Sequence, residues 1–196
     1  IYSENGRVIP GVSEILTEGG LNDFSCVNAE VLARAQQFGN AVHLMCELFD
    51  RDRLNLKTLD KELKPYLNGW ARFKSDFKVT LIDIEQIVSS VKWGYCGKLD
   101  RVVKMQYGKK LEVLTLLDIK TSTTVGITTS LQLAAYQIAW EEEHSQKIAV
   151  RLAVQLLPDD FKIHPFNNPM DKTAFLNFVG NYKWKQKNNL LKIGTY

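Results

Sequence analysis

Cysteine is scarce in this chain. Only Cys26, Cys46 and Cys96 occur among its 196 residues, and they show no paired spacing. Small disulfide-stapled domains carry many more cysteines, at regular intervals. We therefore expect a protein of a reducing compartment, without a disulfide framework.

Long apolar runs and a strong charge of one sign are also missing. No stretch approaches the roughly 20 apolar residues needed to cross a bilayer, and no signal peptide is recognisable. Lysine and arginine outnumber aspartate and glutamate by 25 to 22, which gives a formal net charge of +3. This excess fits a nucleic-acid partner but does not require one. We expect a cytoplasmic protein with no membrane partner.

The length suits a single α/β domain over residues 1–196. Because the sequence begins at Ile1 and not at Met, it leaves open whether residues precede it. The periodicities give helices, then three strands, one helix, two strands and one helix, an order that favours a mixed central β-sheet flanked by helices. The expected helices span residues 12–17, 28–37, 40–50, 57–78 and 131–140 with one more at the C-terminus, and the expected strands span 81–89, 99–106, 114–119, 148–157 and 161–166.

The most informative segment is the run from Leu114 to Ile119, which is apolar except for Thr115 and Asp118. It predicts a strand buried on both faces. Residues two apart in a strand share a face, so Asp118 and Lys120 point the same way. Burying an unpaired charge is costly, so this pair is either a functional site or an ordinary salt bridge.

A second carboxylate comes from the preceding strand. Gly97-Lys98-Leu99-Asp100 leads into that strand, and Gly108 can supply the positive φ of the turn that follows it. The hairpin puts Asp100 opposite residue 116, 117 or 118. An even register brings Asp100 and Asp118 to one face, with Cβ atoms roughly 5 Å apart if directly opposed. An odd register separates them across the sheet.

Two helical segments flank this hairpin. His43 and Glu47 are four residues apart on one helix face, so His43 is either a metal ligand or a helix histidine paired with Glu47. Gln132 and Tyr136 share a face of another helix, where they can hydrogen-bond a phosphate or the site lysine. Alternatively, that helix is an ordinary amphipathic one with Tyr136 in the core.

Two acids and a lysine on one sheet face suit phosphodiester hydrolysis. Carboxylate oxygens bind Mg²⁺ or Mn²⁺, which polarises the phosphoryl oxygen and helps to generate hydroxide. Lys120 can position the attacking water or neutralise charge in the transition state. Glu85, on the strand before the hairpin, is either an extra ligand or a solvent-facing residue.

The order of these motifs resembles the RecB-like branch of the PD-(D/E)xK nuclease superfamily, which includes Cas4-like, phage and mitochondrial exonucleases. The resemblance runs from about Ile9 to Trp140. Leu99 replaces the proline that names the superfamily, and Asp118 replaces the usual glutamate. Some relatives hold an iron–sulfur cluster with four cysteines, but this chain has three, so we expect no cluster. The motifs that carry the resemblance are Ile9-Pro10-Gly11-Val12-Ser13, Gly39-Asn40-Ala41-Val42-His43, Gly97-x-x-Asp100, Asp118-x-Lys120-Thr121-Ser122 and Gln132-x-x-x-Tyr136.

The resemblance implies a restriction-endonuclease-like core and a Mg²⁺- or Mn²⁺-dependent exonuclease that acts on DNA, in the host cytoplasm if a phage encodes it. It implies metal ligation by His43, Asp100, Asp118 and the carbonyl of Ile119. Lys120 is then the catalytic lysine, and Gln132 and Tyr136 support the site or bind DNA. A structure-selective endonuclease and a DNA-binding module without catalysis remain as alternatives.

The C-terminal quarter is rich in lysine, with aromatic residues among them. Tyr182, Lys183, Trp184 and Lys185 are adjacent in the chain. Basic side chains follow phosphates and aromatic rings stack on unpaired bases, so this segment either contacts a single-stranded end or forms a helix with a solvated lysine face.

Overall fold

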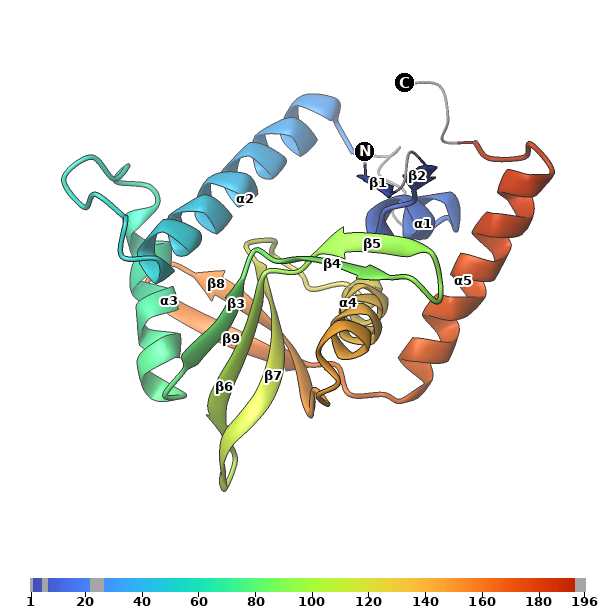
Figure 1. Ribbon diagram of the computed structural model, residues 1–196. Coiled ribbons are helices and arrows are strands. Elements are labelled where there is room, and N and C mark those ends of the chain that lie inside the picture. Colours follow the sequence, from blue (N-terminus) through green and yellow to red (C-terminus); the bar gives the residue numbers. More distant parts are fainter. Residues whose placement is uncertain (1, 5–6, 22–26, 193–196) are drawn as a thin grey trace.

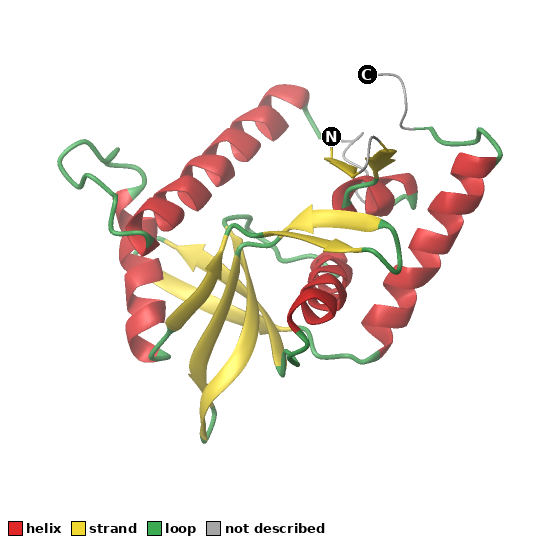
Figure 2. Ribbon diagram, viewed as in Figure 1, coloured by secondary structure: helices red, strands yellow, loops and turns green. Residues whose placement is uncertain are grey.

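The protein is described here by a computed structural model that covers residues 2–4, 7–21 and 27–192 (Figure 1). Helices and strands follow one another in runs along the chain, with the strands gathered at the centre and helices on either side (Figure 2). The elements are β1 (Tyr2–Glu4), β2 (Arg7–Ile9), α1 (Val12–Glu18), α2 (Ala29–Asp50), α3 (Lys64–Asp76), β3 (Thr80–Ile84), β4 (Ile87–Ser90), β5 (Tyr95–Lys98), β6 (Arg101–Tyr107), β7 (Lys110–Lys120), α4 (Thr128–His144), β8 (Val150–Leu157), β9 (Asp160–Pro165) and α5 (Met170–Lys187).

The central sheet has five strands in the order β3-β6-β7-β8-β9. Strands β7 and β8 are parallel, and the other neighbours are antiparallel. Alternate residues of β7 serve opposite faces: Leu116 packs with α1, α4 and α5, whereas Leu117 and Ile119 pack with α2 and α3. The predicted fold class, a mixed central sheet flanked by helices, is confirmed. None of the described helices is long and apolar enough to span a membrane.

The hairpin of β6 and β7 has the even register. Arg101 pairs with Leu117 and Val102 with Leu116, so the residue before Arg101 comes opposite Asp118. The turn uses Gly108 at φ 61°, as expected. The strand predicted from residue 99 begins only at Arg101, because Gly97 and Lys98 belong to β5, which pairs with β4 in a separate two-stranded sheet.

The predicted strand over residues 81–89 is also wrong, because it breaks into β3 and β4 at Glu85. Glu85 has φ 52°, and its N–H donates to the carbonyl of Asp100 at 2.8 Å. The N–H of Leu99 donates to the carbonyl of Gln86 at 2.9 Å. The chain therefore leaves the central sheet beside Glu85 and returns beside Asp100, and the β4–β5 hairpin between them packs against α4 (Figure 1).

Helix α2 is continuous, although a break near Phe38-Gly39 was predicted. An internal glycine costs a helix only about 1 kcal/mol, and the packing of Val42, Met45 and Cys46 on the sheet offsets that cost. Asn28 begins the helix by accepting hydrogen bonds from the N–H groups of Glu30 and Val31. A helix of 22 residues brings the middle of α2 to the end of the sheet.

Helix α3 is shorter than the predicted span of residues 57–78. It begins at Lys64 with Pro65 in its first turn, where proline is favoured, and its buried face carries Leu67, Trp70 and Phe73. The predicted second hairpin is present as β8 and β9, with Asp159 at φ 58° in its turn. The short β1–β2 hairpin was not predicted.

Candidate active site

The two central carboxylates lie side by side where β6 begins and β7 ends. Asp100 and Asp118 are opposite each other by the register of the hairpin. Oδ2 of Asp100 accepts a hydrogen bond of 2.7 Å from the N–H of Ile119, which fixes its carboxylate to the neighbouring strand. Asp118 is only 3% exposed. The burial that the sequence predicted for this strand therefore extends to its acidic residue.

Lys120 lies on the same face and connects the acids to α4. Its Nζ is 2.9 Å from Oδ2 of Asp118 and donates to Oε1 of Gln132 at 3.4 Å. Nε2 of Gln132 in turn donates to the Tyr136 hydroxyl at 3.1 Å. Of the alternatives left open for Gln132 and Tyr136, the structure thus has Gln132 on the lysine and Tyr136 one hydrogen bond further away.

Gly97 has a steric role beside Tyr136. A Cβ atom at this position would come within 2.5 Å of Tyr136 Cε1 and 3.1 Å of Val12 Cγ2, distances that real Cβ contacts do not tolerate without movement. The glycine of the Gly-x-x-Asp motif therefore allows the tyrosine ring to lie against β5.

His43 reaches the carboxylates from α2. Its Nδ1 is 3.5 Å from Oδ1 of Asp100 and 4.0 Å from Oε1 of Glu85. The alternative pairing of His43 with Glu47 is not observed, because Glu47 accepts a hydrogen bond from Arg51 at 3.0 Å. The histidine therefore belongs to the acidic site.

Glu85 is part of the site and does not face solvent, so the solvent-facing alternative is wrong. Its side chain is 7% exposed, with Oε2 at 2.6 Å from Nζ of Lys98 and Oε1 at 2.8 Å from Nη1 of Arg101. Ligand atoms of His43, Glu85 and Asp100 all lie within 4.8 Å of one another. The sequence did not predict the strand break at Glu85. In a continuous strand this side chain would point elsewhere.

A fully buried arginine supports the carboxylates from the opposite face of the sheet. Arg101 donates from Nε to Oδ2 of Asp50 at 2.8 Å and from Nη1 to the carbonyl of Asp100 at 2.7 Å. Oδ1 of Asp50 accepts from Lys74 at 2.7 Å and from the indole of Trp70 at 3.0 Å. Sequence reasoning missed this network, because its residues are dispersed over two helices and a strand.

The acidic site alters the pKa values of its members. Burial alone would lower the pKa of His43, but attraction to Asp100 and the neighbouring acids raises it to about 9. Burial, together with the charge of Asp100, raises the pKa of Asp118 to about 6 although Lys120 opposes this. Burial disfavours the charged form of Asp100, yet the pKa of Asp100 is lowered, since His43 and the Ile119 N–H stabilise its anion.

These residues fit a divalent cation. Oδ2 of Asp118 is buried, with the ammonium of Lys120 at 2.9 Å as its ionic partner. The imidazole of His43 and the carboxylates of Glu85 and Asp100, whose ligand atoms lie close together, are a suitable donor set for Mg²⁺ or Mn²⁺. Asp118 is not part of this group of three, but it lies opposite Asp100 on the neighbouring strand.

Cavities flank the carboxylates on two sides. One, of about 320 Å³, is lined by Asn40, His43, Leu44, Glu47, Glu85, Lys98 and Asp100. The other, of about 430 Å³, is lined by Ser13, Leu16, Leu21, Lys120, Ser122, Thr124, Gly126, Thr128, Thr129 and Gln132. The first cavity touches the metal-binding candidates, and the second touches the lysine.

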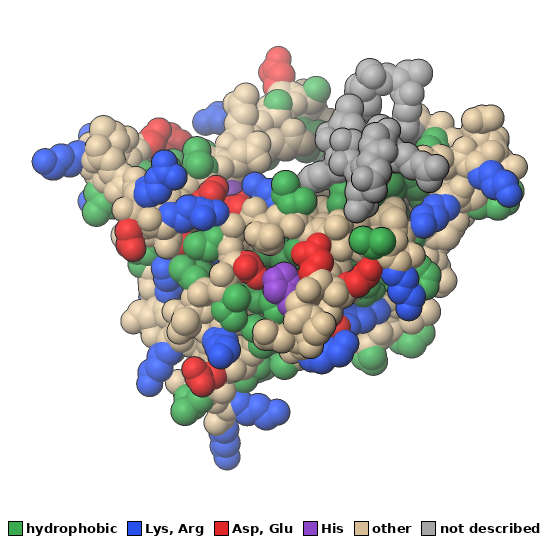
Figure 3. Space-filling view, in the orientation of Figure 1, with side chains coloured by type: hydrophobic (Ala, Val, Ile, Leu, Met, Phe, Trp, Pro, Cys, Tyr) green, Lys and Arg blue, Asp and Glu red, His purple; other side chains and the backbone are tan. Residues whose placement is uncertain are grey.

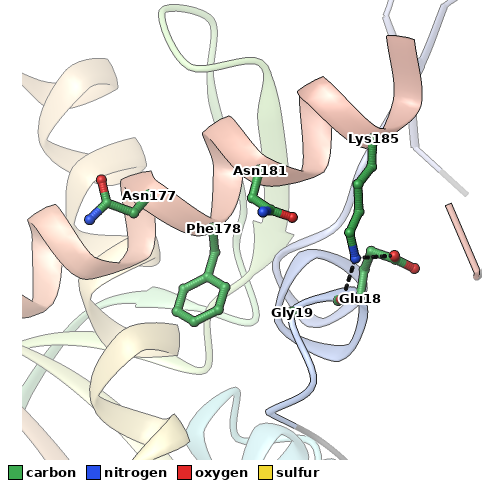
Figure 4. Close-up of a pocket in the computed structure, with 6 residues that line it drawn as sticks. All are labelled: Glu18, Gly19, Asn177, Phe178, Asn181 and Lys185. Carbon is green, nitrogen blue, oxygen red and sulfur yellow. Dashed lines mark hydrogen bonds and ion pairs between the residues drawn. The ribbon is translucent and has the colours of Figure 1, made fainter. Parts of the chain in front are cut away.

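The C-terminal helix does not offer the predicted stacking surface. Tyr182 is buried and its hydroxyl is hydrogen-bonded to Glu14, while Lys185 donates to Glu18 at 2.7 Å (Figure 4). Trp184 is exposed, but its neighbours serve the contact between α5 and α1. On the face in Figure 3, basic side chains are dispersed over the surface and do not form one patch. Lys185, near the end of α5, thus completes the contact between α5 and α1.

The two cysteines in the described part of the chain are buried. Cys46 lies in α2 and Cys96 in β5, where its Sγ is 3.7 Å from the carbonyl oxygen of Pro10. Cys26 lies outside the described residues.

Comparison with known proteins gives similarity of fold only. No family model matches the sequence, and no curated protein matches it. A solved structure from Eubacterium rectale, named "Putative exonuclease", aligns over 98% of this chain and 88% of its own, with a TM-score of 0.52 and 13% identity. The solved structure of SSO0001 aligns over 95% of this chain and 79% of its own, with a TM-score of 0.48 and 15% identity.

Proposed function

We propose that this protein is a metal-dependent deoxyribonuclease that hydrolyses phosphodiester bonds at DNA ends. One observation carries the proposal: Asp100 and Asp118 are adjacent at the end of the sheet, and Nζ of Lys120 is 2.9 Å from Asp118. The fold shared with the Eubacterium rectale protein, whose name includes exonuclease, supports the same conclusion. The resemblance of the motifs to the RecB-like PD-(D/E)xK branch supplies the more specific assignment.

Metal binding is assigned to His43, Asp100, Asp118 and the carbonyl of Ile119. The carbonyl is included because relatives use the middle residue of the Asp-x-Lys motif. If held by these residues, Mg²⁺ or Mn²⁺ would supply Lewis-acid chemistry at the phosphoryl oxygen and would favour deprotonation of water. We add Glu85 as a further acidic residue within reach of an ion, on the basis of its proximity to His43 and Asp100.

Lys120 is the catalytic lysine in this proposal. Asp118 and Gln132 hold its ammonium from two sides, so its charge is oriented before substrate arrives. A preoriented cation stabilises the charge that develops on the phosphoryl oxygens without reorganisation. Gln132 and Tyr136 therefore act by holding the lysine in place.

A single-stranded end is the proposed substrate. The side chains of Asp100 and Asp118 are 12% and 5% exposed, so the scissile phosphate must descend to a recessed position. An unpaired strand is flexible enough to do so, whereas a duplex is stiff over this distance. Tyr182 is buried, so its ring does not stack on a base of that strand.

The test compares linear and circular single-stranded DNA of one sequence, at equal concentration, with Mn²⁺ or Mg²⁺. We expect the linear form to be degraded and the circular form to persist. Equal degradation of both would replace the exonuclease by an endonuclease. Absence of hydrolysis in any metal, with DNA binding intact, would replace it by a binding module.

A further inference from the structure

The cavity beside Lys120 differs chemically from the cavity beside His43. Its volume is about 430 Å³, and five of its lining residues are serine or threonine. Among its described lining residues there is no carboxylate and no arginine, and Lys120 is the one cation. It is therefore a pocket of hydroxyl groups with a single positive charge at one end.

Several of these hydroxyls are available to a ligand. Ser13, Thr124 and Thr129 have side chains that donate no hydrogen bond to another described residue, whereas Ser122 donates to the carbonyl of Thr124 at 2.7 Å. Hydroxyl groups both donate and accept, which suits the oxygens of a sugar and a phosphate. Leu16 and Leu21 add an apolar wall.

The pocket has few groups that could read a base. Gln132 is the only amide among the described residues of its lining, and both ends of that amide are used, by Lys120 and by the Tyr136 hydroxyl. Specific recognition of a base edge needs convergent amide, arginine or carboxylate groups. A ligand here would be held by its backbone atoms, with little dependence on the base.

The position of the pocket relates it to the scissile bond. It shares Lys120 with the catalytic residues, whereas the other cavity shares Asp100 and His43. A strand whose phosphate lies at the carboxylates would therefore have one neighbouring nucleotide on each side. Pockets for small molecules are typically ~300–1,000 Å³, so this one has room for a single nucleotide.

We propose that the hydroxyl-lined pocket binds the nucleotide adjacent to the scissile phosphate, through its sugar and phosphate and without regard to its base. This inference rests on the proposed nuclease function. It adds a substrate subsite formed by α1, the segment after β7 and the first turn of α4. It also makes a deoxynucleoside monophosphate, which resembles the released end, a ligand of the free protein.

The experiment uses dTMP and dAMP as probes, measured by calorimetry with Mn²⁺ present. Thr124→Phe places a ring in the pocket, and Thr123→Phe is the matched control, because Thr123 is equally exposed in the same segment but does not line the pocket. We expect the dissociation constant for either nucleotide to rise about tenfold or more in Thr124→Phe and to stay unchanged in Thr123→Phe. Thermal melting of both variants checks that they fold.

Hydrolysis of linear DNA separates this proposal from the one on which it rests. If the wild type cuts DNA and Thr124→Phe binds nucleotides and cuts as the wild type does, the subsite is wrong and the nuclease assignment stands. If the wild type cuts no DNA but binds both nucleotides in a manner that Thr124→Phe abolishes, the pocket stands and the nuclease assignment fails. A preference of more than about tenfold between dTMP and dAMP would overturn the absence of base recognition.

Discussion

The carboxylate of Asp100 accepts a hydrogen bond from the main-chain N–H of Ile119, at 2.7 Å. The first acid of the site is thereby held by the strand that carries the second acid and the lysine. A main-chain donor cannot change its rotamer, so the separation of the two carboxylates is set by the sheet itself. The geometry that the proposed hydrolysis requires is consequently present before any substrate binds.

Asp118→Asn and Lys120→Ala should each abolish hydrolysis while the fold is retained. Removal of one preorganised charged group costs about 10²–10³ in rate, and loss of a metal ligand adds to this. The measurement is single-turnover cleavage of end-labelled linear DNA, with circular dichroism to check folding. Turnover at the wild-type rate in either variant would remove these residues from the catalytic role.

Asp118→Asn should also make the metal-free protein more resistant to unfolding at neutral pH. The folded protein raises the pKa of Asp118 to about 6, so ionisation of this carboxyl opposes folding above its unfolded pKa. Stability of the wild type should fall as pH rises from about 4 to 6 by this contribution, and Asn, which carries no charge, should lack it. Urea unfolding in a chelator tests this, and a less stable Asn variant at pH 7 would contradict it.

His43→Ala should weaken Mn²⁺ binding measured by calorimetry. Loss of a ligand or of a group that orients one typically costs about 10–100-fold in affinity. His144→Ala is a suitable control, because His144 lies in the last turn of α4, where its ring stacks on Trp140. Equal affinities in His43→Ala and the wild type would show that the imidazole is only structural.

The affinity for Mn²⁺ should rise with pH up to about pH 9. Without metal, the acids around His43 raise its pKa to about 9, and an ion must displace that proton to bind the imidazole. The sign for stability is opposite: protonated His43 stabilises the metal-free fold fully below about pH 6.5, and this contribution is lost as pH rises to about 9. In His43→Gln both dependences should be absent, and calorimetry and urea unfolding across this interval measure them.

Arg101→Met should destabilise the protein strongly. Arg101 is fully buried and paired with Asp50 and Glu85, and removing one partner of a buried ion pair costs about 3–5 kcal/mol. Arg72→Met is the matched control, because Arg72 is exposed and its ion pairs should contribute only about 0–1 kcal/mol. Similar urea midpoints for the two variants would argue against a structural role for the Arg101 network.

Gly97→Ala should lower turnover more than it lowers metal affinity. The added methyl group would displace Tyr136 and, through Gln132, the catalytic lysine, at a cost in stability of about 1–3 kcal/mol. Gly180→Ala serves as the control, since a Cβ there meets nothing within 4 Å. Unchanged kcat in Gly97→Ala would show that the tyrosine can move without affecting Lys120.

Sequence reasoning predicted the parts of this protein that depend on periodicity. The buried strand before Asp118, the turn at Gly108 and the helix with Gln132 and Tyr136 all follow from local patterns of apolar residues. The register of the hairpin remained open, because the chain could fold about Gly108 or about Lys109. The structure has a register shift between Met105 and Tyr107, which local sequence does not predict.

The failures concern features that tertiary contacts decide. The strand breaks at Glu85, whose carboxylate pairs with Lys98 and Arg101. Both partners are too far along the chain to affect local strand propensity. The continuity of α2 across Gly39 depends on packing against the sheet. Neither effect can be recognised in a short window of sequence. The positions of Glu85 and Asp50 at the site could therefore not be predicted.

The two hydrophobic clusters, one on each face of the sheet, support different parts of the site. His43 and the Arg101–Asp50 pair are anchored in the α2/α3 cluster, whereas Gln132 and Tyr136 are anchored in the α1/α4/α5 cluster. Strand β7 lies between the two clusters and contributes residues to both. Substitutions in the α2/α3 cluster should therefore change metal binding, and substitutions in the α1/α4/α5 cluster should change the chemical step of the proposed hydrolysis. This holds even where the substituted residue lies far from the site. A variant of this chain can therefore lose metal binding and keep the groups for the chemical step, or the reverse.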